Sequence, residues 1–375
     1  MKLHPTLRRA SGGALLGALA ALAACSDAPV APAALAPGDG QDLVERVVAM
    51  GFHRDHIVDE GEHYRVEGDI IITKASLLSP SYSRAAPDGP RLQWHTTNLV
   101  SQATMAGGLT VNLTGISGNT NWTNAVRNAI ASWGYTYGTK IKFVETSGSA
   151  HITFNFGTLP SGVVAQASFP SGGGPGPTVT IASAYANSLS SSQKQWVMVH
   201  ELGHTIGYRH SNWHQYESSS PNGAIQVPGT PYTDASSVMR TGLSSAPSWS
   251  GFSTNDHTAN RYLYPGPAAT FTSQGYDGSG HPTFSWNAVS DASQYHVWLN
   301  IYYYEFVYEP SFPGSGYWDW VRYSYDQGYV SGTTFTESWY TYTGNSDCSP
   351  YYEVYAVYPS GKEGEAAITN SFETC

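Results

Sequence analysis

The stretch His200-Glu201-Leu202-Gly203-His204-Thr205-Ile206-Gly207-Tyr208-Arg209-His210 has the form H-E-x-x-H-x-x-G-x-x-H. Two histidines four residues apart on a helix share one face, so the imidazoles of His200 and His204 can reach one metal ion. Gly207 allows a sharp turn, because glycine tolerates positive φ, and the turn brings His210 back to the same point. Three nitrogen ligands with one open position are typical of a catalytic zinc. Glu201, beside the first ligand, is placed to act on a zinc-activated water.

A methionine follows this motif, in Ser237-Val238-Met239, after a stretch rich in glycine, proline and serine. The extended motif with a methionine turn resembles the metzincin metallopeptidases. The segments 207–213, 229–239 and 252–265 are most similar to the bacterial dual-action HEIGH metallopeptidases, and the resemblance spans residues 92–265. Leu202 replaces the isoleucine of that family's motif. Thr241 stands where astacins carry a tyrosine ligand, so we expect no tyrosine-assisted oxyanion role.

The resemblance implies a zinc-dependent endopeptidase that acts on protein or peptide substrates. In that family, residues at the positions of His200, His204 and His210 bind the zinc, the one at Glu201 is the general base, and the one at Met239 forms a structural floor beneath the histidines. The alternative is a surface adhesin or glycan-binding lipoprotein with a vestigial zinc site. A third hypothesis keeps the zinc hydrolase chemistry but gives it a non-peptide substrate, since ligands specify the metal chemistry and not the cleft's preference.

Other candidate ligands are weaker. Asp234 and Asp256 leave a bound calcium open, but no calcium-loop pattern supports it. His151 lies in an expected strand, whereas His214 and His257 lie in expected loops. We interpret these three histidines as ordinary surface or hydrogen-bonded residues.

The first 24 residues have the pattern of a signal peptide: a basic start followed by a short apolar stretch. The end of this stretch, Leu22-Ala23-Ala24-Cys25, resembles a bacterial lipobox, which implies that Cys25 is lipidated. Ser26 after the cysteine points by resemblance to a bacterial outer-membrane or cell-surface lipoprotein, or one released extracellularly. The alternative is ordinary cleavage with Cys25 incidental.

The chain has 3 cysteines, an odd number for an exported protein. If Cys25 carries lipid, Cys348 and Cys375 remain as a pair for a disulfide in an oxidising compartment. The alternative is two unpaired buried cysteines. A formal net charge of −10 with 18 Lys+Arg argues against a nucleic-acid partner. Membrane contact is expected through the lipid anchor only.

Residues 25–91 are predicted to be a lipid-anchored tether and pro-region, with a helix over 41–50 and a strand over 63–73. Within it, Val66-Glu67-Gly68-Asp69-Ile70 resembles the Phe-x-Gly-Asp-Ile segment of astacin pro-regions. The resemblance implies that Asp69 is a latency switch on the zinc. The alternative is a Gly-Asp turn into a strand, which needs no metal.

Residues 92–265 are predicted to form an α/β (α+β) metzincin-type catalytic domain with a mixed sheet and an active-site helix. Strands are expected over 109–113, 141–146, 151–156, 164–169 and 178–182. Asn119 or Asn121 is expected to cap a first helix, and Ser190 with Gln193 to form a capping box on the helix that carries His200. The resemblance implies that 164–169 is the edge strand above the cleft, where a substrate adds as a further strand.

Residues 266–375 are predicted to form an all-β sandwich. The alternation around Trp286, and in the run that contains Tyr352 and Val354, resembles a fibronectin type III-like domain with these residues in its second and sixth strands. Residues 302–329 have no predicted place in that pattern. The aromatic side chains are candidates for a glycan or protein ligand, with core and cross-strand pairs as the alternative.

Overall fold

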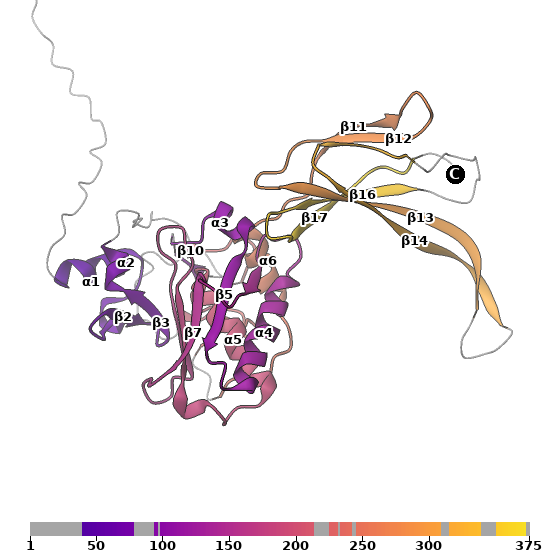
Figure 1. Ribbon diagram of the computed structural model, residues 1–375. Helices are drawn as coiled ribbons and strands as arrows, with labels where there is room; N and C mark the ends of the chain where they lie inside the picture. Colours follow the sequence, from indigo (N-terminus) through magenta and orange to yellow (C-terminus); the bar gives the residue numbers. More distant parts are fainter. Residues whose placement is uncertain are drawn as a thin grey trace, which may run out of the picture. The chain divides into compact units, whose positions relative to one another are not determined.

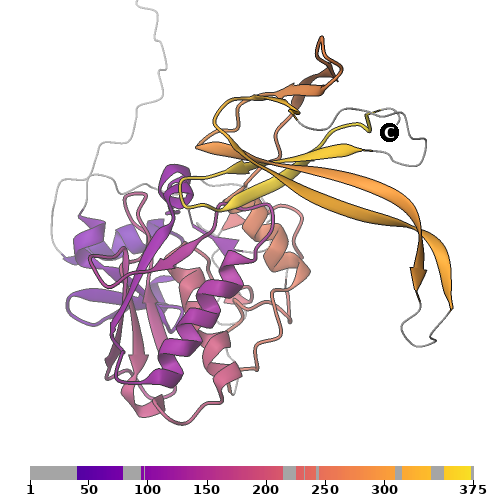
Figure 2. The same cartoon turned by 45° about the vertical axis from the view of Figure 1, so that its right-hand side comes forward.

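The computed structural model describes residues 40–78, 94–96, 98–213, 225–231, 233–241, 245–308, 315–338 and 350–372, all within one compact unit. The fold combines an eight-stranded mixed sheet and a few helices with further antiparallel sheets towards the C-terminus (Figures 1 and 2). The predicted α+β class followed by β structure is therefore confirmed. No helix within the described ranges is long and apolar enough to cross a membrane.

The large sheet has the strand order β1-β2-β3-β8-β9-β7-β5-β6. Strands β9, β7, β5 and β6 run parallel to one another, with β6 at the edge, whereas β8 is antiparallel to β9. These strands span Leu109–Gly115 (β5), Phe143–Glu145 (β6), Ile152–Gly157 (β7), Ala165–Ser168 (β8) and Thr178–Ala182 (β9). Each strand buries alternate or successive apolar residues, and these join one hydrophobic core with the two longest helices.

Helices α4 (Thr120–Gly134) and α5 (Ser191–Thr205) pack against each other and form part of that core. Asn119 caps α4 by accepting a hydrogen bond from the Trp122 amide. Ser190 and Gln193 form the predicted capping box on α5. These caps fix where α5 begins, and therefore which of its faces points at the sheet.

The N-terminal segment folds around a small core of its own. It contains α1 (Gly40–Ala49), η1 (Arg54–His56), β1 (Val58–Asp59), β2 (His63–Val66), β3 (Ile70–Thr73) and α2 (Lys74–Leu77). The single strand expected over 63–73 is wrong, because the chain turns between Val66 and Ile70 to form an antiparallel hairpin. Glu67 and Gly68 occupy the left-handed region, with φ of 52° and 100°, and reverse the chain there. Phe169, which directly follows Ser168 in the chain, is also part of this core.

Strand β8 is not an edge in this chain. β3 pairs with it in parallel, with Ile70 opposite Ala167 and Ile71 opposite Ser168. The Ala167 amide donates to the Asp69 carbonyl at 2.9 Å. The expectation of a free edge over 164–169 is therefore wrong for the full chain, because the N-terminal hairpin satisfies the main-chain groups that would otherwise be open.

Five short elements complete this part of the chain. They are β4 (Trp94–His95), α3 (Gln102–Gly107), η2 (Ser183–Tyr185), β10 (Ile225–Gln226) and α6 (Thr254–Leu263). Strands β4 and β10 pair with each other to form a separate two-stranded sheet.

The last part of the chain forms two antiparallel sheets, ordered β11-β12-β15 and β14-β13-β16-β17. Their bounds are Phe271–Tyr276 (β11), Pro282–Trp286 (β12), Gln294–Tyr308 (β13), Gly316–Val330 (β14), Thr334–Thr336 (β15), Tyr351–Val357 (β16) and Glu363–Ile368 (β17). Trp286 on β12 and Tyr352 and Val354 on β16 share one core. The stretch 302–329, unplaced by sequence, contributes the outer parts of the long β13–β14 hairpin (Figure 1).

Candidate metal centre and active site

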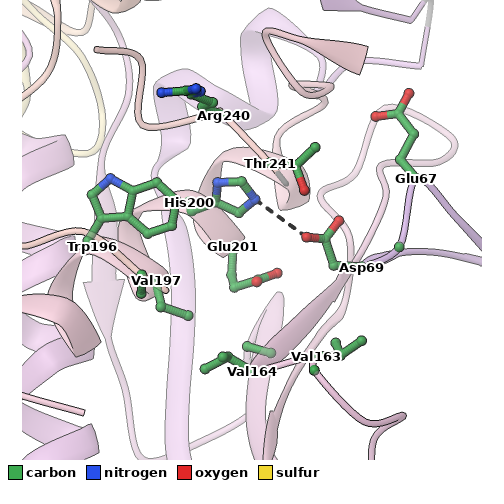
Figure 3. A pocket seen from close by; sticks show the side chains of 14 residues that line it. Glu67, Asp69, Val163, Val164, Trp196, Val197, His200, Glu201, Arg240 and Thr241 are labelled. Atoms are coloured by element: carbon green, nitrogen blue, oxygen red, sulfur yellow. Dashed lines mark ion pairs between the residues drawn. The ribbon is translucent and has the colours of Figure 1, made fainter. Parts of the chain in front are cut away.

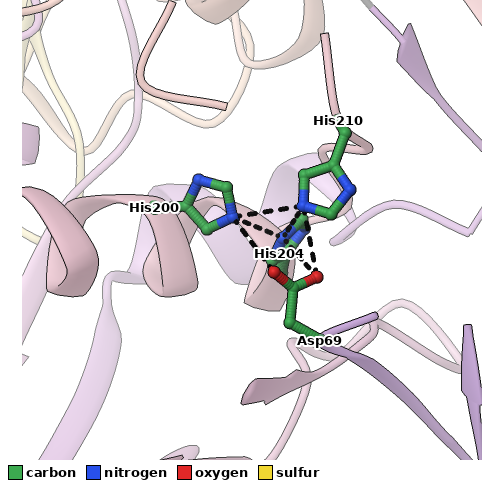
Figure 4. A group of neighbouring side chains, drawn as sticks. All are labelled: Asp69, His200, His204 and His210. Atoms are coloured by element: carbon green, nitrogen blue, oxygen red, sulfur yellow. Dashed lines mark hydrogen bonds and ion pairs between the residues drawn. The ribbon is translucent and has the colours of Figure 1, made fainter. Parts of the chain in front are cut away.

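The first two histidines of the motif lie on the last turns of α5. His200 and His204 are 3% and 0% exposed, and their rings face the same point. Gly207 then adopts φ of 105°, a conformation that favours glycine, and a Cβ there would lie 2.7 Å from Cδ2 of Leu99. The reversal places His210 against the other two imidazoles (Figure 4).

The three Nε2 atoms converge. Nε2 of His204 lies 3.0 Å from that of His200 and 3.2 Å from that of His210, and the His200–His210 separation is 3.2 Å. Tetrahedral zinc with bonds of about 2.0–2.1 Å holds its nitrogens about 3.3 Å apart, so the spacing fits one zinc ion. The donor set is also right, because neutral imidazole is a preferred zinc ligand.

Main-chain carbonyls orient two of these rings. Nδ1 of His200 donates to the Val238 carbonyl at 2.7 Å, and Nδ1 of His204 donates to the Tyr208 carbonyl at 2.7 Å. A carbonyl only accepts, so each Nδ1 carries the proton and each Nε2 keeps its lone pair for a metal. Burial, reinforced by neighbouring His200, lowers the pKa of His204 to about 3, which keeps that ring neutral.

Asp69 supplies a fourth group. Its Oδ1 lies 3.2 Å from Nε2 of His210 and 3.6 Å from Nε2 of His204, and its Oδ2 lies 3.7 Å from Nε2 of His200. One ligand atom from each of these four residues falls within 4.8 Å of every other, in the single such group found among the described residues. The arrangement therefore offers three nitrogens and one carboxylate oxygen to a metal (Figure 4).

Glu201 lies beside this cluster and is 2% exposed. Among the described residues no group hydrogen-bonds its Oε2. Burial, with the negative charge of Asp69 added, raises the pKa of Glu201 well above its ordinary value. Both carboxylates line a cavity of about 280 Å³ together with His200 and Trp196 (Figure 3). The Trp196 ring stacks on His200 at a centroid distance of 5.2 Å.

The methionine turn packs against α5, the helix that carries His200 and His204. Met239 is 1% exposed, and a Cβ added to Gly203 of α5 would meet its side chain. The buried carboxylate of Asp256 accepts from the Ser237 hydroxyl at 2.7 Å and from the Val238 amide at 3.1 Å. These two hydrogen bonds of Asp256 could not be predicted from the sequence. The one available signal was an acidic residue at the third position of a capped helix.

The two aspartates weighed for calcium are engaged elsewhere. Asp234 accepts hydrogen bonds from the Ser236 amide at 2.9 Å and from Nδ2 of Asn255 at 3.0 Å, and also from the Ser253 hydroxyl. Asp256 holds the methionine turn and the N-terminus of α6. Neither belongs to the potential metal-binding group found among the described residues. The hydrogen bonds of these two carboxylates instead stabilise turns and the start of a helix.

A buried ion pair beside His210 was missed from sequence. The Glu67 side chain is 2% exposed and the Arg209 side chain 0%, and Arg209 Nε donates to Glu67 Oε1 at 2.6 Å. The second oxygen, Oε2, lies 3.2 Å from Nδ1 of His210. The available signals were an arginine inside the zinc motif and an acidic residue two positions before Asp69.

The remaining predicted residues lie apart from the centre or beyond the described chain. His151 bonds to Thr110, as expected of an ordinary histidine. His257 lies in α6 rather than in the expected loop, and its ring packs on Phe252. His214 is outside the described residues. So are the signal peptide, Cys25, Cys348 and Cys375, and the predicted lipidation and disulfide stay predictions.

Comparison with known proteins adds a family. The family model described as dual-action HEIGH metallo-peptidase matches residues 64–264. This match begins earlier than the expected 92–265 and includes Glu67 and Asp69. No curated protein matches the chain. Among solved structures, the crystal structure of wild-type OgpA from Akkermansia muciniphila covers 76% of this chain and 96% of its own, at 10% identity and a TM-score of 0.19, too low to carry an argument.

Proposed function

Because the chain belongs to the dual-action HEIGH metallopeptidase family, we propose that it is an exported zinc-dependent endopeptidase of the metzincin type. The observation that carries this proposal is the convergence of three buried Nε2 atoms within 3.2 Å of one another. Family membership supports protein or peptide substrates and zinc as the metal.

Each residue of the centre has one role in the proposal. His200, His204 and His210 hold the zinc, which when bound supplies Lewis acidity towards water and a peptide carbonyl. Glu201 accepts a proton from the attacking water and passes it to the leaving amine. Met239 packs beneath the histidines and touches no substrate.

The full chain is proposed to be latent. Two contacts support this: the Asp69 carboxylate faces all three imidazoles, and β3 pairs with β8. A carboxylate oxygen is a sound zinc ligand and takes the position that water needs. A peptide that adds to β8 as a strand needs the main-chain groups that β3 already uses. Removal or displacement of the N-terminal hairpin then activates the enzyme.

The proposed location rests on the first residues alone. The signal-peptide and lipobox patterns support export and lipidation at Cys25, at a bacterial outer membrane or cell surface. An exported chain also favours a disulfide between Cys348 and Cys375. Mass spectrometry of the mature N-terminus tests the lipid, and free-thiol labelling of the non-reduced protein tests the disulfide.

A binding role for the C-terminal sheets is a second proposal. Tyr308, Trp318 and Trp320 on the β13–β14 hairpin are 72%, 59% and 49% exposed, an unusual display of large rings. A glycan or protein ligand for these rings is compatible with a peptidase. If the zinc centre is vestigial, binding alone is the function.

The deciding experiment compares two zinc-loaded chains that begin at Ser26. One carries Asp69→Ala, and the other carries Asp69→Ala with Glu201→Gln. Both are incubated with a mixed peptide library, with and without a zinc chelator, and the products are identified by mass spectrometry. The proposal expects cuts by the first chain only, and none with the chelator. If the first chain binds zinc but cuts nothing, and still cuts nothing after the N-terminal hairpin that pairs with β8 is removed, the adhesin or non-peptide alternative holds instead.

A further inference from the structure

Arg209 and His210 form a binding site for a carboxylate group, here called the seat, and the Glu67 side chain occupies it. Arg209 donates to this carboxylate through Nε at 2.6 Å and through a second guanidinium nitrogen. The His210 amide donates at 3.3 Å, and Nδ1 of His210 lies 3.2 Å away. Two guanidinium nitrogens and one main-chain amide thus donate to one pair of oxygens, with the His210 ring beside them, a geometry that matches an anionic planar group.

The backbone of Glu67 adopts a conformation that is unfavourable for a glutamate. Its φ of 52° lies in the left-handed region, where glycine or asparagine is favoured. Glycine follows at 68, so the hairpin turn has no need of glutamate for its shape. The side chain, and not the shape of the turn, therefore accounts for a glutamate at this strained position: its carboxylate binds Arg209.

The seat is buried and strongly cationic. The Arg209 guanidinium carbon lies 4.3 Å from the centre of the Phe52 ring and 5.0 Å from that of Trp213. The Glu67 and Arg209 side chains are 2% and 0% exposed, so this ion pair is shielded from solvent.

Glu67, which covers the seat, lines the cavity of the active centre together with Asp69 and Glu201 (Figure 3). Arg209 and His210 are not among the lining residues while Glu67 is in place. Asp69 follows Glu67 by two positions on the same hairpin. One segment therefore brings one carboxylate to the histidine cluster and a second to Arg209.

We propose that Arg209 and His210 form a carboxylate-binding subsite of the cleft, which takes an acidic side chain of a peptide when Glu67 leaves. In the latent chain Glu67 occupies this subsite from within. The peptide part of the inference rests on the proposed peptidase function, whereas the carboxylate seat does not. The acidic side chain lies next to the third zinc ligand, so its preferred position in the substrate is close to the scissile bond.

The first test vacates the seat. Glu67→Gly fits the local φ and removes a side chain with the carbon skeleton of propionate. Sodium propionate, added at constant ionic strength, can therefore occupy the emptied seat. The melting temperature of this full-length, zinc-loaded variant is expected to rise with propionate and to saturate, and neutral propionamide should have no effect. Equal responses to the two compounds, or no response to either, overturn the proposal.

A matched control is available at Asp291, the other described non-glycine residue with positive φ, at 64°. Its carboxylate bonds to Lys140 at 2.9 Å but is 28% exposed and lies outside the cavity. Asp291→Gly should respond to propionate no more than the unmodified chain does. Glu67→Gln, which keeps the side-chain shape, should also fail to respond, because its amide still fills the seat.

The second test uses peptides without requiring cleavage. The full chain with Glu67→Gly, Asp69→Ala and Glu201→Ala is titrated with peptide pairs that differ only by Glu or Gln at each position. One position is expected to favour Glu by at least about tenfold, as loss of a charge-assisted hydrogen bond predicts. Adding Arg209→Gln should abolish that preference.

Equal affinity for every Glu and Gln pair overturns the acidic subsite. This outcome is separate from the peptidase test, because binding is measured in a chain without the general base. A chain that prefers Glu peptides, while the Asp69→Ala chain cuts nothing even without its N-terminal hairpin, keeps the subsite and rejects the peptidase. Circular dichroism of each variant checks that the comparison is between folded proteins.

Discussion

The main-chain oxygen of Val238 accepts a 2.7 Å hydrogen bond from Nδ1 of His200 and thereby sets the direction of the first metal ligand. The amide of the same residue donates to Oδ2 of Asp256 at 3.1 Å. Asp256 is 3% exposed and also accepts from Ser237 and from Ser253 at the start of α6. A carboxylate outside the group formed by Asp69 and the three histidines thus positions one of those histidines through one peptide unit.

Asp256→Ala should therefore weaken zinc binding by about 10–100-fold, the range for outer partners of metal ligands. Asp256→Asn keeps an acceptor oxygen and should recover part of this loss. Competition with a chelator measures the affinity without reference to activity. Thr254→Ala, an exposed change on the same helix, is the control, and an equal effect of both alanine variants would contradict a positioning role for Asp256.

Gly203 is required by packing rather than by its backbone. An added Cβ would lie 3.0 Å from Cε of Met239 and closer still to its sulfur, and Met239 is 1% exposed. Alanine normally favours a helix over glycine by about 1 kcal/mol. We nevertheless expect Gly203→Ala to lower the free energy of unfolding by about 1–3 kcal/mol, as overpacking does.

Gly134→Ala is the matched control, since its added Cβ meets nothing within 4 Å at the end of α4. Urea unfolding of both variants makes the comparison. Combining Gly203→Ala with Met239→Ala should cost less than the sum of the two single changes, because the second removes the clash. Full additivity would show that the two side chains do not compete for space.

Local spacing explains what could be predicted from the sequence. His200, His204 and the capping box of α5 follow from helix geometry, and the return of His210 follows from one glycine. The family resemblance made the centre recognisable from a single contiguous motif. Such features depend on neighbours within one or two turns of the chain, and the structure places them where the pattern indicates.

Contacts across long loops could not be predicted in this way. Glu67 and Arg209 are 142 positions apart, and neither residue carries a periodic signal that names the other. The pairing of β3 with β8 was missed for a related reason. A strand of three isoleucines has no preference for one particular partner edge, so its register depends on the whole fold. A Gly-Asp turn was an alternative at this place, but the reversal at Glu67 was not predicted, because this non-glycine residue adopts a conformation that glycine favours.

Asp69→Ala should yield a full-length chain that hydrolyses peptides without N-terminal processing. The reason is that the carboxylate now facing the three imidazoles is removed while the ligands remain. Rates on a peptide substrate are compared with those of the unmodified chain, and intact mass confirms that neither has been cut. Glu62→Ala, an exposed acidic change on the same hairpin, should stay as inactive as the unmodified chain. Equal rates for all three chains would show that loss of the Asp69 carboxylate does not relieve latency while β3 still pairs with β8.

Lys362 joins the C-terminal sheets to the end of α4. Its ammonium nitrogen donates to the Thr136 carbonyl at 2.8 Å and to the Gly134 carbonyl, and the residue is 9% exposed. Lys362→Met should leave both carbonyls without this donor and lower the free energy of unfolding by about 1–3 kcal/mol. Lys142→Met, a half-buried change nearby, should cost less.

The same lysine predicts a pH dependence. Burial lowers the pKa of Lys362 to about 8, against 10.5 for an ordinary lysine. Between these values the unfolded chain holds a proton that the folded chain has released, so stability rises with pH in this window. The neutral amine still has two N–H groups, enough for both carbonyls, and the junction survives deprotonation. Denaturant unfolding at several pH values from 7.5 to about 10.5 should show a steeper rise for the unmodified chain than for Lys362→Met, whereas identical slopes would mean that Lys362 stays charged in the folded protein.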